Sequence, residues 1–278
     1  GIAMGRTGTD VAREAADLVL LDDHFASIVA GIEQGRATFV NIRRFLTYHL
    51  TSNVAELVPF LVWGLSGGRV PLALGVLQIL AIDVLTDTGS AVALGAEPPS
   101  PHLLEGPPVT GRLLNRTVLW RAFAVLGSTE AVMAMAAFLA SFVGAGWRWG
   151  DSFPIATLAA ASGAAFLSVV LGQMGNAYAC RSSRRWPGAL HVRNRYLEPA
   201  VVFSMVLATA SLLVPPIAAL FGQAWPTWTG LSIALLSPGV LLCVDAGDKS
   251  VRRARGRVGG ILAAVTAERP FGVELASR

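Results

Sequence analysis

Charged residues are scarce in this 278-residue chain. They make up 14% of it, while hydrophobic residues make up 53%; in an ordinary soluble domain about 25% of residues are charged. The mean hydropathy is correspondingly high, at +0.56. This composition excludes an ordinary soluble domain and predicts a predominantly α-helical, polytopic membrane protein.

Cysteine is nearly absent, and a secretory signal is not found. The two cysteines, Cys180 and Cys243, fall at the predicted cytoplasmic ends of two apolar stretches, where disulfides do not ordinarily persist. The first 44 residues contain no continuous apolar core of the kind that a signal peptide needs. No internal repeat is visible either.

Six apolar stretches are long enough to cross a bilayer, which takes about 20 residues for a helix. They cover approximately residues 46–66, 70–94, 118–143, 154–180, 197–221 and 228–246. We therefore expect a six-helix transmembrane domain over residues 45–246. Residues 1–44 precede it, and a basic tail, residues 247–278, follows it.

Arginine residues gather in alternate connections between these stretches. Loops rich in Lys and Arg stay in the cytoplasm, and the other three connections hold only Arg69 and Arg148. Both termini are thus expected on the cytoplasmic side of the membrane. We expect that membrane to be a bacterial-type plasma membrane. This arrangement also explains the net charge of +4, so membrane lipid is the expected partner and nucleic acid is not.

Acidic residues inside the first two stretches carry the functional prediction. Asp83, Thr86 and Asp87 share one face of a helix, because positions three and four apart are neighbours. The preceding stretch has Ser52, Asn53 and Glu56 at the same spacing. Each carboxylate at mid-bilayer costs about 2.5–3.5 kcal/mol. We interpret the two helices as facing each other across a site for a hard cation, which carboxylate, amide and hydroxyl oxygens suit.

Other polar residues in the spans have simpler interpretations. Ser52 or Asn53 alone would more often form a hydrogen bond between membrane helices than bind an ion. We interpret Glu130 in the third span as paired in the interior, and Asp245 at the end of the sixth as an interfacial charge.

Residues 1–36 differ from the rest and indicate α/β structure. Thr9 or Asp10 can cap a short helix that runs through Ala16, and residues 17–21 are typical of a buried strand. A second helix is predicted from about Phe25, continuing past Gly35 into the first span. So short a segment cannot bury a core of its own, and we expect it to complete a domain whose remainder lies elsewhere.

Glycine, proline and tryptophan predict where the spans bend and end. Thr88-Gly89 directly follows Asp87, which predicts local unwinding of the second span. Pro215-Pro216 should disrupt the fifth span near its outer end. Trp225 and Trp228 suit interfacial anchors on the outer side.

A resemblance follows from the N-terminal motifs. Gly1-Ile-Ala-Met-Gly-Arg-Thr-Gly-Thr-Asp-Val-Ala-Arg-Glu-Ala-Ala-Asp and Thr51-Ser-Asn-Val-Ala-Glu56 resemble the end of the phosphorylation domain and the next membrane helix of P-type cation-transporting ATPases. The similarity is strongest up to about Pro108 and weaker through the last four spans. It implies a short α/β remnant of a phosphorylation (HAD-like) domain followed by six spans, as in the P2-like pumps for calcium, sodium–potassium and protons rather than the heavy-metal branch.

The resemblance also implies roles for particular residues. Asn53, Glu56, Asp83, Thr86 and Asp87 correspond to cation ligands of these pumps, Asp83 matching the sodium–potassium and proton–potassium pumps. A candidate additional ion site comprises Ser52, Gln173 and Asn176.

The parent enzyme implied by the resemblance hydrolyses ATP, with Mg²⁺, through an aspartyl-phosphate. Neither an Asp-Lys-Thr-Gly-Thr nor a Thr-Gly-Glu motif occurs here, so we expect a C-terminal portion that is inactive alone, contains no catalytic residue and has the N-terminal part of the pump as its partner. The alternatives are a stand-alone six-helix channel or secondary transporter and a non-catalytic membrane remnant.

Overall fold

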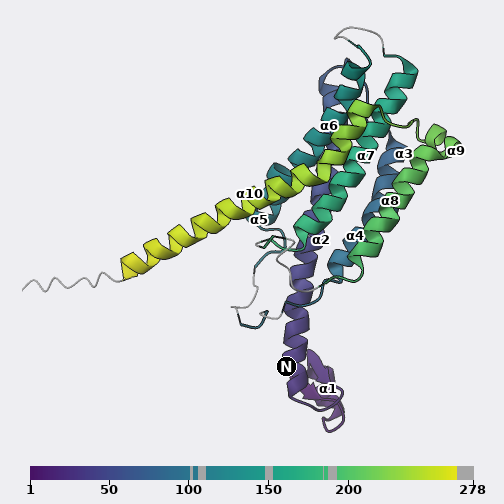
Figure 1. Ribbon diagram of the computed structural model, residues 1–278. Coiled ribbons are helices and arrows are strands. Elements are labelled where there is room, and N and C mark those ends of the chain that lie inside the picture. Colours follow the sequence, from purple (N-terminus) through teal and green to yellow (C-terminus); the bar gives the residue numbers. More distant parts are fainter. Residues whose placement is uncertain (101–102, 106–110, 148–152, 184, 187–192, 268–278) are drawn as a thin grey trace, which may run out of the picture.

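Helices dominate the computed structural model, which describes residues 1–100, 103–105, 111–147, 153–183, 185–186 and 193–267. Figure 1 shows an elongated helical bundle with a small lobe at one end, joined to the bundle by a single helix. The prediction of a predominantly α membrane protein is confirmed. The last part of the predicted basic tail, 268–278, lies outside the described residues.

The N-terminal lobe, residues 1–25, has the α/β character that its sequence predicts. Strand β1 (Ile2–Met4) pairs in parallel with β2 (Leu18–Leu20), and α1 (Asp10–Ala15) connects them. As expected, Thr9 caps α1, its hydroxyl accepting from the Ala12 N–H at 3.2 Å. The predicted burial of residues 17–21 is wrong for most of that stretch, since Leu18 and Leu21 are 42% and 78% exposed and only Leu20 is buried.

Asp23 closes the loop after β2. Its carboxylate accepts the N–H groups of Arg6 and Thr7, each at 2.8 Å. These hydrogen bonds, the one from Arg6 foremost, lower the pKa of Asp23 below its ordinary value because they favour the charged form. Asp23 has φ of 56°, a left-handed conformation that Asp tolerates better than most residues.

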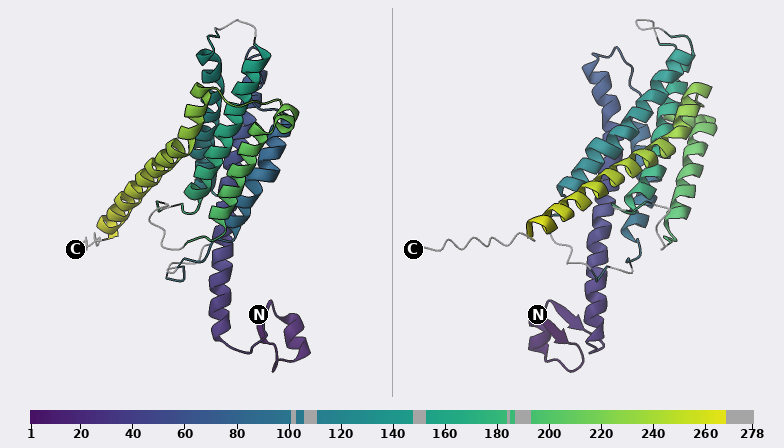
Figure 2. Two further views of the ribbon diagram at one scale, coloured as in Figure 1. Left: turned by 45° about the vertical axis from the view of Figure 1, so that its right-hand side comes forward. Right: turned by 60° about the vertical axis from the view of Figure 1, so that its left-hand side comes forward.

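Helix α2 (Ala26–Leu65) joins the lobe to the bundle without interruption. The predicted continuation past Gly35 into the first span is thus observed. We call its first part, residues 26–44, the stalk. Figure 2 shows the stalk projecting from the bundle, with the lobe beside its outer end.

The second apolar stretch begins later than predicted and is irregular at a different point. It comprises α3 (Val76–Ala81), a π-helical segment η1 (Ile82–Asp87) and α4 (Thr88–Gly95). Residues 70–75 are not helical. The predicted unwinding at Thr88-Gly89 is wrong: both residues are helical, and the backbone instead widens in the preceding turn, between Ala81 and Thr88.

The remaining helices complete the bundle. They are α5 (Arg116–Leu119), the π-helical η2 (Trp120–Leu126), α6 (Gly127–Gly144), α7 (Ile155–Cys180), α8 (Leu197–Leu213), α9 (Pro215–Leu220) and α10 (Trp228–Ala267). As predicted, the fifth stretch breaks at the Pro215-Pro216 pair, where Val214 is extended. Helix α10 continues beyond the predicted sixth span and leaves the bundle obliquely (Figure 1).

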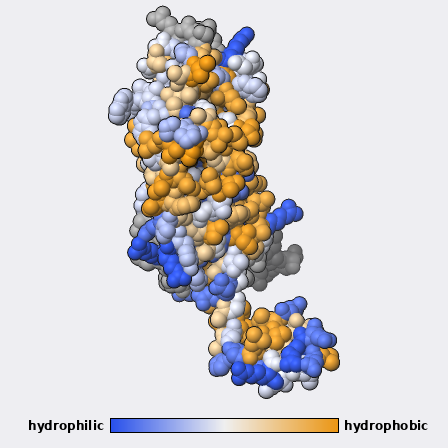
Figure 3. Space-filling view, turned by 90° about the vertical axis from the view of Figure 1, so that its right-hand side faces the viewer, coloured by the Kyte–Doolittle hydropathy of each residue, from blue (hydrophilic) through white to orange (hydrophobic). Residues whose placement is uncertain are grey.

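Among the described residues, four helical stretches are long and apolar enough to cross a membrane: Val76–Gly95, Arg116–Gly144, Ile155–Cys180 and Trp228–Arg255. Helix α8 is apolar but shorter, and the inner half of α2 lies in the same bundle (Figure 2). The figure of six spans therefore stays a prediction. Figure 3 shows apolar side chains covering the middle of the displayed face of the bundle.

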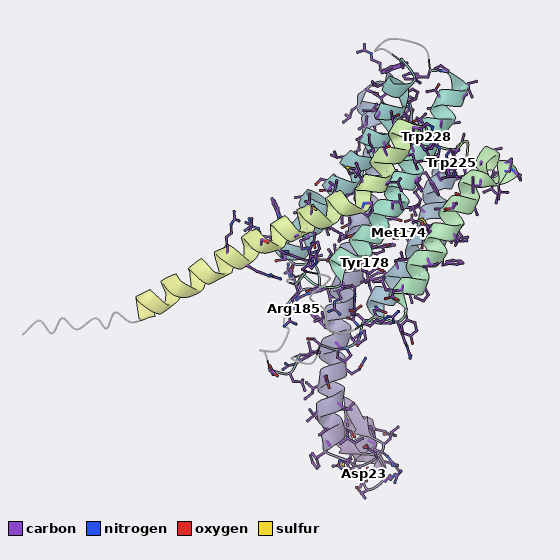
Figure 4. The ribbon with its side chains drawn as sticks, viewed as in Figure 1. Asp23, Met174, Tyr178, Arg185, Trp225 and Trp228 are labelled. Carbon is purple, nitrogen blue, oxygen red and sulfur yellow. The ribbon has the colours of Figure 1, made fainter. Side chains whose placement is uncertain are left out.

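Helix α7 is the central helix of the bundle. Every residue from Ala161 to Ala177 is buried, and α7 packs against α2, α6, α8 and α10. Two glycines permit close approach, because a Cβ at Gly175 would lie 2.9 Å from Pro238 Cα and one at Gly172 would lie 2.9 Å from Glu130 Cγ. In Figure 4, Trp225 and Trp228 lie at the end of the bundle far from the lobe, and Arg185 lies toward the lobe.

Candidate functional site

Asp87, in the second predicted span, contacts the first span through its side chain. It is fully buried, and its carboxylate accepts a 3.4 Å hydrogen bond from the Ser52 hydroxyl of α2. Its other oxygen lies 3.1 Å from His49 Nδ1, also on α2. In this structure, α2 and the second stretch thus meet at Asp87, as the spacing of their polar residues predicts.

His49 is a member of the site that the sequence analysis missed. Its spacing was informative, since it precedes Ser52 by three residues and Glu56 by seven, which places all three on one face of a helix. The imidazole is about half exposed, at 40%, and stacks on Phe45 with ring centroids 5.4 Å apart. A histidine beside a buried carboxylate can balance its charge when protonated.

Glu56 brings α7 into the site. It is 4% exposed, and its carboxylate accepts the side-chain N–H of Gln173 at 3.4 Å. The opposite atom of that amide, Gln173 Oε1, is buried and has no hydrogen-bond partner among the described residues. Of the candidate additional site, Gln173 therefore contacts the acidic cluster directly.

Asp83 and Thr86 lie within the π-helical segment η1. Asp83 is partly exposed, and its Oδ1 is buried without a hydrogen-bond partner within the described parts of the chain. Thr86 is buried and donates its hydroxyl to the Ile82 carbonyl at 2.9 Å. Its own carbonyl accepts the Ser204 hydroxyl of α8 at 2.6 Å. π-Helical turns are rare and occur frequently at functional sites.

Two predicted ligands are placed away from the cluster or are already engaged. Asn53 is exposed on α2 rather than buried with Glu56. Asn176 is buried, but its amide donates to the Tyr48 carbonyl at 3.2 Å and accepts from the Cys180 thiol at 3.2 Å. In this structure Asn176 connects α7 to α2 and has no free side-chain atom facing the carboxylates.

The assembled groups are of one chemical type. Carboxylate oxygens come from both helices, and the hydroxyl of Ser52, 3.4 Å from the Asp87 carboxylate, adds a further oxygen. Such donors suit hard cations. Across the described residues, no three His, Cys, Asp or Glu side chains are grouped closely enough to hold a metal ion.

Glu130 and Asp245 differ from their sequence-based interpretations. Glu130 is 1% exposed, yet neither of its carboxylate oxygens has a hydrogen-bond partner in the described portion of the chain, so the predicted interior pairing is wrong. Asp245 is fully buried rather than interfacial, and it forms ion pairs with Arg121, at 2.6 Å, and with Lys249. The sequence alone did not show the Arg121 partner, which is 124 residues away along the chain, although Lys249 lies only four residues from Asp245.

The sequence of this chain is similar to those of known membrane proteins. Residues 71–251 match the family described as "Cation transporting ATPase, C-terminus". The sodium/potassium-transporting ATPase subunit alpha of Drosophila melanogaster is 33% identical over 237 residues, which are 75% of this chain and 23% of the relative.

Two further relatives are similar over about half of the chain. The sodium/potassium-transporting ATPase subunit alpha-3 of Oreochromis mossambicus is 39% identical over 164 residues, 54% of this chain and 16% of the relative. The plasma membrane-type calcium-transporting ATPase 5 of Oryza sativa subsp. japonica is 39% identical over 136 residues, 49% of this chain and 12% of the relative. The chain thus spans less than a quarter of the length of these three relatives.

Proposed function

Because the chain belongs to the family of cation-transporting ATPase C-termini, we propose that it forms the membrane-embedded, cation-binding part of an ATP-driven pump. The observation that supports this most directly is the buried Asp87, which faces Ser52 and His49 of α2 across the helix interface. A buried carboxylate in a membrane bundle is costly and usually marks an ion or proton pathway.

We assign the transported cation to the oxygens of Glu56, Asp83 and Asp87. Thr86 lies in the same π-helical segment as Asp83 and Asp87. Asn53 is exposed, so it would join the site only if another part of the pump packed against its side of α2. Of the candidate additional site, Gln173 positions the Glu56 carboxylate through its amide N–H, and Ser52 supports Asp87.

ATP and Mg²⁺ belong, in this proposal, to the preceding part of the pump, which would be the partner of this chain. The sequence contains no Asp-Lys-Thr-Gly-Thr motif, so these 278 residues alone should neither hydrolyse ATP nor transport ions. The arginine-rich loops and the lobe would face the cytoplasm, and the connection with Trp225 and Trp228 would face outward. These placements agree with the opposite ends that the two groups occupy in Figure 4.

The test is cation-dependent ATPase activity of the chain joined to its N-terminal part, measured over calcium, magnesium, manganese, sodium and potassium. Hydrogen bonds to a charged group contribute about 1.5–3 kcal/mol, so Asp87→Asn should raise the cation concentration for half-maximal activity by about 10- to 100-fold. Glu198→Gln, which removes an exposed carboxylate at the start of α8, is the matched control and should change little. The assigned site would be refuted if ATP hydrolysis did not depend on any of these cations, or if Asp87→Asn left the cation dependence unchanged.

A further inference from the structure

Asp87 has a hydrogen-bond donor at each of its two carboxylate oxygens. Oδ1 accepts the Ser52 hydroxyl at 3.4 Å, and Oδ2 lies 3.1 Å from His49 Nδ1. Because a carboxylate oxygen only accepts, the Nδ1–H of His49 donates in this contact. Asp87 is fully buried, so the imidazole fills the space beside Oδ2 that a bound cation would need.

Asp83 differs from Asp87, although both belong to the same π-helical segment. The Oδ1 atom of Asp83 has no hydrogen-bond partner in the described part of the chain, and its side chain is partly exposed. Asp83 thus retains an oxygen that no described group occupies. Asp87 has none, and it gains one only when a neighbouring donor gives way.

Ser52 and His49 differ in how they can respond to an ion. A hydroxyl donates one hydrogen bond and keeps lone pairs that can face a cation, and Ser52 is fully buried, so it can stay in place. A ring nitrogen that carries a proton cannot bind a metal ion. The His49 side chain is 40% exposed, and stacking on Phe45, with 15° between the ring planes, holds it beside Asp87. His49 is therefore the donor that has room to turn away.

We propose that the imidazole of His49 competes with the transported cation for Asp87 and so determines how tightly the site binds that cation. This inference deepens the proposed function and rests on it, because it takes Asp87 as a cation ligand. Nδ1 donates both in the imidazolium and in the neutral ring that has its proton there, so the competition does not depend on a change of protonation. His49 acts on the ion only through Asp87, which makes it a positioning residue.

The test is the cation-dependent ATPase activity of the chain joined to its N-terminal part, measured with the cation that activates the wild type. His49→Phe keeps a ring that can stack on Phe45 but removes the donor. We expect it to lower the cation concentration for half-maximal activity by about tenfold, the effect of losing one hydrogen bond to a charged group, while the maximal rate changes little. His49→Ala should act in the same direction. His24→Ala, which removes an exposed imidazole of the lobe, is the control and should leave both values unchanged.

A double-mutant cycle distinguishes competition at Asp87 from a general effect on packing. In the Asp87→Asn background, His49→Phe should no longer strengthen activation by the cation, because the carboxylate through which His49 acts is gone. An undiminished effect in that background would refute the competition. Thermal unfolding shows whether each variant folds, and if His49→Phe does not, His49→Ala takes its place in the cycle.

Failure of this inference is distinguishable from failure of the proposed function. If Asp87→Asn weakens activation while both His49 variants need as much cation as the wild type, or more, the competition is refuted and the assigned site stands. If Asp87→Asn leaves the cation dependence unchanged, the proposed function loses its site and the inference is refuted with it.

Discussion

Glu130 and Asp245 are both buried carboxylates, yet their surroundings differ at the level of single atoms. Asp245 has two basic partners, Arg121 and Lys249, and both of these also donate to the Ala179 carbonyl, at 3.3 and 3.1 Å. This cluster connects η2, the end of α7 and α10. Asp245 thus stabilises the bundle, whereas the Glu130 carboxyl is buried without a hydrogen-bond partner among the described residues.

Removing the charge of Asp245 should destabilise the protein strongly. Asp245→Asn leaves Arg121 and Lys249 buried without their anion, and breaking a buried ion pair in this way costs about 3–5 kcal/mol. The measurement is thermal unfolding in detergent. Arg193→Gln breaks the exposed pair with Glu198 and should cost no more than about 1 kcal/mol. Equal unfolding temperatures for the two variants would contradict the assigned role of Asp245.

At the level of helices, much of the fold follows from sequence because its causes are local. The cap at Thr9, the break at Pro215-Pro216 and the continuous helix through Gly35 depend on neighbouring residues, and all three were predicted. The π-helical turns were not predicted, since they depend on what packs against them: in η1, the Ser204 hydroxyl binds the Thr86 carbonyl. The acidic residues of the site could be identified from spacing, but the contacts of His49, Asn53 and Glu130 depend on the arrangement of helices.

Gly175 is one of the glycines that permit the close packing of α7 against α10. A Cβ at Gly175 would lie 2.9 Å from Pro238 Cα and 3.1 Å from its carbonyl oxygen, both rigid backbone atoms. Gly175→Ala should therefore destabilise the bundle by about 1–3 kcal/mol, the usual cost of overpacking. Gly239→Ala is the control, because a Cβ there meets nothing within 4 Å, and it should be neutral or stabilising by up to about 1 kcal/mol. The measurement is the thermal unfolding of both variants. If Gly175→Ala did not change the stability, α10 would be shown to move away from α7 without cost.

At the scale of the whole molecule, α2 is the connection between the lobe and the candidate site. The stalk is anchored where it enters the bundle, since the Asn41 amide donates to the carbonyls of Gly95 and Glu97, at 3.1 and 2.8 Å. Glu97 in turn is paired with Arg181 at 2.7 Å. Displacement of the lobe would therefore move both α2, with Glu56, and the end of the helix that contains Asp87.

A break in the stalk should uncouple the lobe from the ion site. Proline inside a helix removes a hydrogen bond and costs about 3 kcal/mol or more, and Gly35 has space for a side chain. In the chain joined to its N-terminal part, Gly35→Pro should retain phosphorylation by ATP but lose most cation transport. Gly35→Ala keeps the helix continuous and should transport normally. The measurement is phosphoenzyme formation alongside ion uptake into vesicles; undiminished uptake by Gly35→Pro would show that α2 does not transmit the movement.

The π-helical segment Ile82–Asp87 also limits how the length of this part of the chain can vary. A π-turn holds more residues than an α-turn does, so losing one residue from it would restore a regular helix. The helix on either side would keep nearly the same orientation, because the wide turn accommodates the extra residue. Asp83 and Asp87 both lie inside the segment, so a loss between them would leave them three residues apart instead of four. Asp83 and Asp87 would no longer keep their present orientation to each other. Among descendants of this sequence, substitutions in the segment should thus be tolerated more readily than single-residue deletions.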